Sequence, residues 1–150
     1  MKIMPLSGNH EEKIEMINNI CKKYNIVIMY LFGSQKENAY KMLNGEDILI
    51  KDPLADIDVG VVFSYDINKV DGRYKLYGDI YNDLIEIFPK LDLVFLQENH
   101  SVFQTEAISG ICIYAESEEL KDDYELTTLA KAADFKCVLE KFYEEHLEEL

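Results

Sequence analysis

Hydrophobic residues form three short continuous runs, separated by segments in which they recur every three or four positions. The first run, Ile26 to Phe32, holds seven apolar residues and is short enough for a strand buried on both faces. Residues 56–63 and 91–96 are also mainly apolar, but the first carries two carboxylates near its beginning and the second carries one. The runs predict three buried strands, two of which have acidic residues near their first positions.

Helical spacing of apolar residues fills most of the sequence between these runs. Gly and Pro interrupt it: Asn44-Gly45 ends one periodic segment, Pro89 stops another, and Gly110 ends a third. The pattern predicts helices at 11–23, 35–43, 74–88 and 107–110, with two further short strands at 47–51 and 111–114.

The last segment, 118–150, has neither Gly nor Pro and carries an amphipathic stripe. We expect one long C-terminal helix that extends a single domain spanning residues 1–150. Most of the stripe is expected to pack on that domain. A helix of this length overhangs a small domain, so part of it is available to another chain, which is compatible with a homo-oligomer.

Size and composition are those of one globular domain: 150 residues, 48% apolar. The succession of helices and strands indicates an α/β (α+β) fold. No apolar run approaches the roughly 20 residues of a membrane span, and the first residues lack a signal-peptide core. The three cysteines are far apart and show no zinc spacing, so we expect reduced thiols in a cytoplasmic protein with no membrane partner.

The formal net charge is -14, from 29 acidic and 15 basic residues. Such a chain does not neutralise a phosphate backbone, so we expect no direct binding of nucleic acid. It can still handle a nucleotide if divalent cations stand between its carboxylates and the phosphates, and it would attract a basic protein.

Carboxylates at the mouths of two strands are the first candidates for chemistry. Asp56 and Asp58 are two apart on a predicted strand, so their side chains leave one face with Cα atoms roughly 6.6 Å apart. If Asp92 begins a neighbouring strand, three carboxylates share one spot and repel one another. Such a cluster binds a cation or holds a proton; otherwise each Asp merely ends a strand or caps a turn.

A Gly-Ser pair at the end of the first strand is the second candidate. Gly33 and Ser34 precede a predicted helix, where backbone N–H groups and a hydroxyl can cradle a phosphate. Mg²⁺ prefers carboxylate, water and phosphate oxygens. A phosphate-binding bend opposite a carboxylate cluster is an arrangement suited to Mg²⁺-dependent phosphoryl transfer.

These motifs resemble the minimal nucleotidyltransferases of the DNA polymerase β-like superfamily, and within it the MNT-type antitoxins paired with HEPN-domain toxins. The resemblance spans most of the chain, and the antitoxin branch is favoured mainly by the tail. It rests on Leu31-Phe32-Gly33-Ser34, Ala55 to Val62, Leu91 to Val94, Gly110 to Tyr114 and, more loosely, Ala133 to Lys136 with Tyr143.

The resemblance implies a small mixed sheet flanked by helices, with ATP and Mg²⁺ as ligands. Gly33 and Ser34 would hold the triphosphate, Asp56 and Asp58 the metal, and Asp92 would be the third carboxylate and help deprotonate the acceptor. In the antitoxin branch the implied reaction is transfer of AMP from ATP to a tyrosine of the HEPN-type toxin, which blocks its RNase activity.

Two features differ from the family pattern. Residues 35–55 form a longer segment than usual, which we interpret as an inserted hairpin near Asn44-Gly45. The basic residue that commonly follows the Gly-Ser pair is missing, and either Lys36 or Lys41 is a candidate replacement. Two other functions therefore remain open: a catalytically impaired binding module that neutralises its partner by contact, and an enzyme that nucleotidylates a small molecule.

Overall fold

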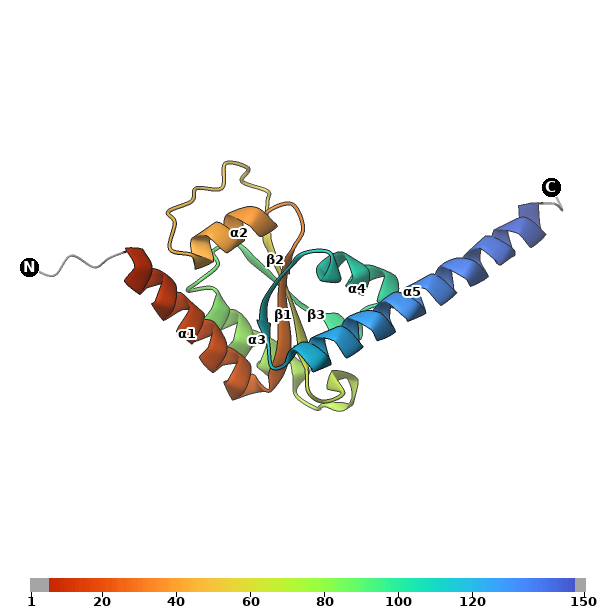
Figure 1. Ribbon diagram of the computed structural model, residues 1–150, viewed down its shortest axis with the longest axis horizontal. Helices are drawn as coiled ribbons and strands as arrows, with labels where there is room; N and C mark the ends of the chain where they lie inside the picture. Colours follow the sequence, from red (N-terminus) through yellow and green to blue (C-terminus); the bar gives the residue numbers. More distant parts are fainter. Residues whose placement is uncertain (1–5, 148–150) are drawn as a thin grey trace, which may run out of the picture.

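The computed structural model describes the backbone of residues 6–147 and the side chains of residues 10–146. Helices and strands alternate through most of this range (Figure 1). The strands are β1 (Ile26–Phe32), β2 (Ile57–Phe63), β3 (Leu91–Phe95) and β4 (Ile111–Ala115), and the α-helices are α1 (Leu6–Tyr24), α2 (Lys36–Leu43), α3 (Arg73–Leu84), α4 (Ser101–Ile108) and α5 (Glu118–Leu147). Two short 3-10 turns, η1 (Ile67–Lys69) and η2 (Leu96–Glu98), follow β2 and β3.

The four strands form one mixed sheet in the order β3-β2-β1-β4. β1 is antiparallel to both β2 and β4, whereas β2 and β3 are parallel. Every residue of β1 is buried, as its continuous apolar run predicted. The small mixed sheet flanked by helices is confirmed.

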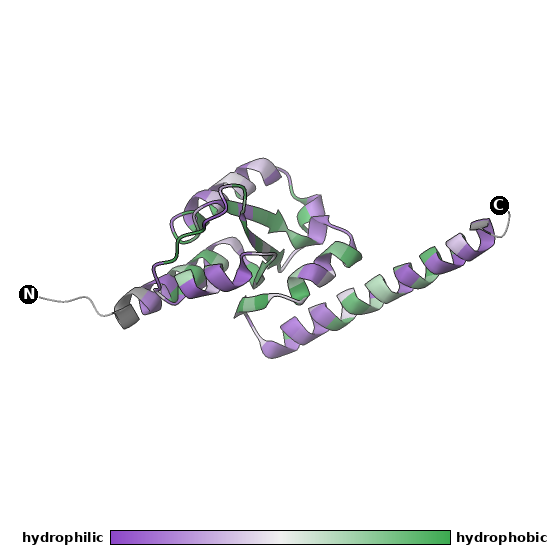
Figure 2. Ribbon diagram, turned by 90° about the horizontal axis from the view of Figure 1, so that it is seen from above, coloured by the Kyte–Doolittle hydropathy of each residue, from purple (hydrophilic) through white to green (hydrophobic). Residues whose placement is uncertain are grey.

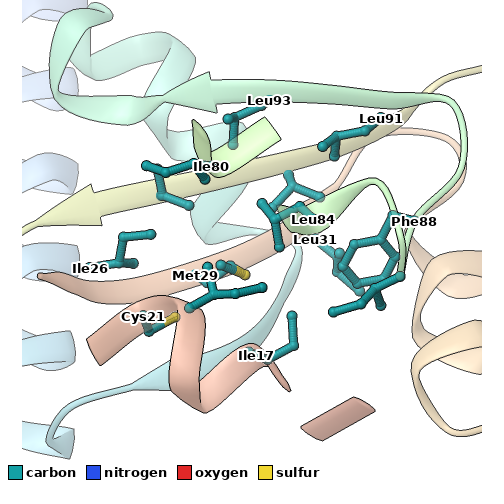
Figure 3. Packing of buried hydrophobic residues seen from close by; sticks show 14 of the residues in the cluster. Ile17, Cys21, Ile26, Met29, Leu31, Ile80, Leu84, Phe88, Leu91 and Leu93 are labelled. Carbon is teal, nitrogen blue, oxygen red and sulfur yellow. The ribbon is translucent and has the colours of Figure 1, made fainter. Parts of the chain in front are cut away.

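Helices cover the two faces of the sheet unequally. α1, α2 and α3 lie over one face and enclose the larger apolar cluster, in which Ile17, Leu84 and Phe88 are fully buried (Figure 3). Burying one such side chain contributes about 1.5–3 kcal/mol. α4 and the first half of α5 lie over the other face, around a smaller cluster that includes Tyr30 and Phe32.

The segment between α2 and β2 corrects one prediction. Residues 47–51 form no strand, and there is no hairpin at Asn44-Gly45; the chain runs irregularly from residue 46 to residue 56. Ile48 and Ile50 pack against the main cluster, while Leu49 between them is 85% exposed. The alternation of residues in 47–51 therefore reflects a loop whose apolar side chains pack on the core. No strand of the sheet pairs with this segment.

Other boundaries shift without changing the element. α4 begins at Ser101, earlier than predicted, because the His100 Nδ1 accepts a hydrogen bond from the Val102 N–H (3.2 Å) and caps the first turn. α3 ends at Leu84, before the turn that leads to Pro89. The long C-terminal helix is confirmed to Leu147, and residues 148–150 lie outside the described range.

α5 leaves the rest of the structure partway along its length and projects away from it (Figures 1 and 2). No helix in the described range is long and apolar enough to cross a bilayer.

Candidate active site

Four strand ends meet at one edge of the sheet. Because β1 and β2 are antiparallel, the end of β1 lies beside the beginning of β2, and Phe32 pairs with Asp58. Because β2 and β3 are parallel, Asp58 in turn pairs with Asp92. Register alone therefore places these two carboxylates side by side, next to the bend at Gly33.

The bend after β1 needs glycine at its first position. Gly33 has a φ of 78°, a left-handed conformation that side chains disfavour. A Cβ atom there would also collide with Oδ2 of Asp58. The carboxylate of Asp58 is thus packed directly against the backbone of the Gly-Ser bend, and Gly33 and Ser34 are themselves exposed.

The bend leads into α2, which begins at Lys36. The side chain of its N-cap residue, Gln35, makes no capping bond to the backbone. Its Oε1 accepts a hydrogen bond from the side-chain amide of Asn38 instead (2.8 Å). No side chain caps the first turn of α2, although the Lys36 N–H donates to the carbonyl oxygen of Gly33 at 3.4 Å. Oxygen atoms of a phosphate are suitable acceptors for the N–H groups at such a helix terminus.

The electrostatics of Asp58 show how crowded this edge is. Burial raises the pKa of Asp58 to about 6 from an ordinary 3.8. The charge of Asp92 and a side-chain hydrogen bond with it act in the same direction, followed by the charges of Asp56 and Glu106. Asp58 therefore takes up a proton more readily than an ordinary aspartate, and a cation at this edge would favour its charged form.

Asp56 is placed differently from the other two carboxylates. It lies one residue before β2, is exposed, and acts on Asp58 through its charge. Within residues 10–146, no three His, Cys, Asp or Glu side chains are close enough to form a ready metal site. The metal role of Asp56, Asp58 and Asp92 therefore stays a prediction.

The residues present nevertheless suit Mg²⁺. Asp58 and Asp92 offer only carboxylate oxygens, which this ion prefers, and their mutual repulsion falls when a cation lies between them. The remaining positions of an octahedral ion are normally filled by water and substrate phosphates. Asp58 and Asp92, beside the bend at Gly33 and Ser34 where we expect phosphates, would meet this requirement.

Sequence reasoning missed Glu106. This exposed residue of α4 contributes to the raised pKa of Asp58 from the helix that covers the second face of the sheet. Gly110 brings α4 and β4 against β1, because a Cβ there would collide with the carbonyl oxygen of Leu31. Recognising α4 from Ser101 onward, with a close approach at Gly110, would have placed Glu106 near the site.

Comparison with known proteins follows this geometry. A family model described as polymerase beta, nucleotidyltransferase matches residues 15–119. This range contains all four strands, the Gly-Ser bend and all three predicted carboxylates. A comparison with curated proteins gives no match.

Solved structures share the fold. A chain from a crystal structure of a toxin-antitoxin with AMP-PNP matches with a TM-score of 0.61 and 14% identity, covering 89% of this chain and 98% of its own length. A chain from a structure of a tri-AMPylated Shewanella oneidensis HEPN toxin in complex with an MNT antitoxin matches with a TM-score of 0.58 and 14% identity, over 92% and 98% of the two chains. At this identity the likeness concerns the fold.

Proposed function

Because this chain belongs to the polymerase beta nucleotidyltransferase family, we propose that it transfers AMP from ATP to a hydroxyl group, with a tyrosine of a HEPN-type toxin as the acceptor. The observation that carries the proposal is the register of Asp58 with Asp92, directly against the Gly33 bend. The structural likeness to a chain from a complex that holds a tri-AMPylated HEPN toxin supports the choice of acceptor.

Each residue at the edge takes one role in this proposal. The backbone of Gly33 and Ser34, with the first turn of α2, holds the phosphates of ATP. Asp56, Asp58 and Asp92 hold Mg²⁺, with Asp56 completing the set from its exposed position before β2. Bound Mg²⁺ supplies charge neutralisation between the carboxylates and the phosphates.

The transfer step needs a proton acceptor. The acceptor oxygen bonds to the α-phosphorus of ATP while the bond from that phosphorus to the bridging oxygen breaks, and pyrophosphate leaves with the electron pair. Asp92 is exposed at the edge and takes the hydroxyl proton. Its position in register with Asp58 supports this role, because it keeps Asp92 beside the proposed metal ligands.

Exposure of the edge favours a macromolecular acceptor. Gly33, Ser34, Asp56 and Asp92 are all exposed, so a hydroxyl on the surface of another protein reaches them without entering a deep cavity. The acidic chain would attract a partner with basic residues around the modified tyrosine.

Transfer of label from ATP tests the proposal directly. The chain is incubated with Mg²⁺, α-labelled ATP and the HEPN-type protein of its own genome, and label on that protein is measured. Asp58→Asn is expected to remove transfer, while Asp79→Asn, on the exposed surface of α3, is a matched control that retains it. Folded wild-type protein that transfers no label contradicts the proposal.

The partner's RNase activity separates catalysis from contact. If AMP transfer is the mechanism, Asp56→Asn combined with Asp58→Asn restores the RNase activity of the partner even when the two proteins still bind. A double variant that still neutralises the partner shows instead that contact is sufficient.

A further inference from the structure

One tyrosine of this chain has the exposure that the proposed reaction requires of an acceptor. The chain has ten tyrosines, all within the range whose side chains are described, and three of them are exposed: Tyr40, Tyr74 and Tyr143. Tyr74 is 91% exposed, against 42% for Tyr40 and 54% for Tyr143. The hydroxyl of Tyr74 is therefore the tyrosine hydroxyl that another molecule reaches most easily.

The charges around Tyr74 are opposite in sign to the net charge of the chain. That net charge is -14, but Arg73 and Lys75 flank Tyr74 directly, and residues 69–78 hold three basic residues and one acidic residue. Arg73 is held by Glu98 at 2.9 Å, whereas Lys75 is exposed. The predicted metal ligands of the candidate site are all acidic, so unlike charges would draw this segment toward such a site.

Glycines near Tyr74 leave its side chain uncovered. Gly72 directly precedes α3, and Gly78 lies one helical turn after Tyr74, on the same side of the helix. A Cβ atom at either glycine would meet nothing within 4 Å. Gly within a helix is unfavourable relative to Ala, and no close packing requires it at position 78. The surface beside Tyr74 is therefore open to a second molecule.

Tyr74 lies away from the candidate site of its own chain. The first half of α3 lies beside the end of β3, because the Tyr77 hydroxyl donates to the carbonyl oxygen of Leu93 (2.8 Å) and its ring lies 5.4 Å from that of Phe95. Asp92 is near the beginning of β3, about 10 Å before Phe95, and belongs to the other face of the sheet. Figure 1 shows the chain entering α3 from the end of the sheet opposite α2. A reaction at Tyr74 therefore needs the site of another molecule.

We propose that the chain transfers AMP to Tyr74 of a second copy of itself, an inference that rests on the proposed function. The Tyr74 oxygen bonds to the α-phosphorus of the ATP held by the other copy. The bond from that phosphorus to the bridging oxygen breaks, and pyrophosphate leaves with the electron pair. The hydroxyl proton passes to Asp92 of the copy that holds ATP.

Labelling of the chain without any partner tests this inference. The full chain is incubated with Mg²⁺ and α-labelled ATP, and the labelled residue is identified by mass spectrometry of the digested chain. We expect the label on Tyr74, and Tyr74→Phe should lower the labelling at least tenfold. An unchanged melting temperature, expected because Tyr74 is so exposed, shows that this variant is folded.

Tyr143→Phe is the matched control. Tyr143 is also exposed, but it is followed by Glu144 and Glu145, which a carboxylate-lined site repels. We expect Tyr143→Phe to be labelled like the wild type. Label that persists in Tyr74→Phe would overturn the assignment of the acceptor to Tyr74.

A mixture of two variants tests whether the transfer occurs between molecules. Asp58→Asn lacks a proposed metal ligand but keeps Tyr74, whereas Tyr74→Phe keeps the candidate site. In the mixture, we expect Tyr74→Phe to label Asp58→Asn, which carries a tag that distinguishes its mass, while Asp58→Asn alone stays unlabelled. If the wild type labels itself but Asp58→Asn receives no label in the mixture, transfer between two copies is wrong.

Reversal of one charge tests how the site recognises this tyrosine. Lys75→Glu should lower the rate of self-labelling by about twofold to fivefold, because it replaces an attraction by a repulsion. Lys75→Arg keeps the charge and should keep the rate. Equal rates in both variants would contradict recognition through the charge of Lys75.

A parallel reaction with the HEPN-type protein separates this inference from the proposed function. Tyr74→Phe should label that protein at the wild-type rate, because Tyr74 takes no part in the candidate site. Label on the HEPN-type protein with none on the wild-type chain overturns self-modification and leaves the proposed function standing. Label on neither protein contradicts the proposed function and self-modification together.

Discussion

The two faces of the sheet are built from the same strands, but one face packs into the larger apolar core and the other carries the candidate site. In β2, Ile57, Val59 and Val61 point into the cluster under α1, α2 and α3, and in β3, Leu91 and Leu93 do the same. The residues between them, Asp58 and Asp92, belong to the other face, where α4 and α5 leave the strand beginnings open. Period-two alternation lets one strand contribute to the core and to the candidate site at once.

This division separates stability from chemistry. The filled face gains from burial at every inward position, with Val59 and Leu84 fully buried. The open face holds a carboxylate whose pKa is raised by burial and by its neighbours, so its charged form opposes folding. Placing a charge on the filled face and removing the charge of Asp58 from the open face should therefore change stability in opposite directions.

The largest expected effect comes from moving a carboxylate to the filled face. Val59→Asp places an unpaired charge where Val59 is fully buried, at a cost of about 4 kcal/mol or more, enough to unfold most of the chain. Circular dichroism with thermal melting measures this loss. The neighbouring substitution Asp58→Asn, one position away on the open face, should not lower the melting temperature, and equal losses in both variants would contradict the division.

Gly33→Ala is the next largest change. Ala at a φ of 78° costs about 1 kcal/mol, and its Cβ would also displace the Asp58 carboxylate. Gly72→Ala is the matched control, because Gly72 has the same φ and its Cβ would meet nothing within 4 Å. We expect both variants to lose similar stability, but only Gly33→Ala to lose label transfer, by about a hundredfold.

Matching transfer rates in the two glycine variants would show that the contact between Gly33 and Asp58 has no part in the reaction.

Tyr30→Phe probes how α5 is fastened to the open face. Tyr30 is buried, and its hydroxyl donates to Oε1 of Glu125 at 2.8 Å. Removing this bond should lower the free energy of unfolding by about 1–2 kcal/mol, measured by urea denaturation. Glu125 keeps its ion pair with Lys121 (3.3 Å), which limits the loss. No change would mean that the bond between Tyr30 and Glu125 does not help to hold α5 on the sheet.

The sequence predicted best those elements whose hydrophobic pattern clearly favours one type of secondary structure. A seven-residue apolar run that is rich in β-branched residues favours a strand buried on both faces over a helix, and β1 has the predicted bounds. Asp58 and Asp92 each belong to a predicted strand, so their meeting required only the parallel register. The alternation at Ile48 and Ile50 was ambiguous, because a loop anchored on the core produces the same pattern as a strand.

Two acidic residues near Asp58 were harder to place. Asp56 lies just before β2, where strand alternation no longer fixes the direction of a side chain. Glu106 reaches the neighbourhood of Asp58 through the packing of α4 on the sheet, a long-range contact that leaves no local signature in the sequence.

The smallest expected effect is the pH dependence of stability that comes from Asp58. The folded state raises the pKa of Asp58 to about 6, so it binds the proton more tightly than the unfolded state does. The stability that this proton confers is complete below about pH 3.8 and is lost as the pH rises to about 6. Partial exposure keeps the effect smaller than the shift alone would give.

Comparison with Asp58→Asn isolates this contribution from those of the other acidic groups. In EDTA, the melting temperature of the variant relative to wild type should rise between pH 4 and pH 6 and then stay constant. At neutral pH, Mg²⁺ should then stabilise the wild type more than the variant, because the cation neutralises the carboxylates that the proton has left. If the difference between the two proteins does not change with pH, Asp58 does not interact with the other carboxylates. That result would also contradict a metal-binding role for Asp58.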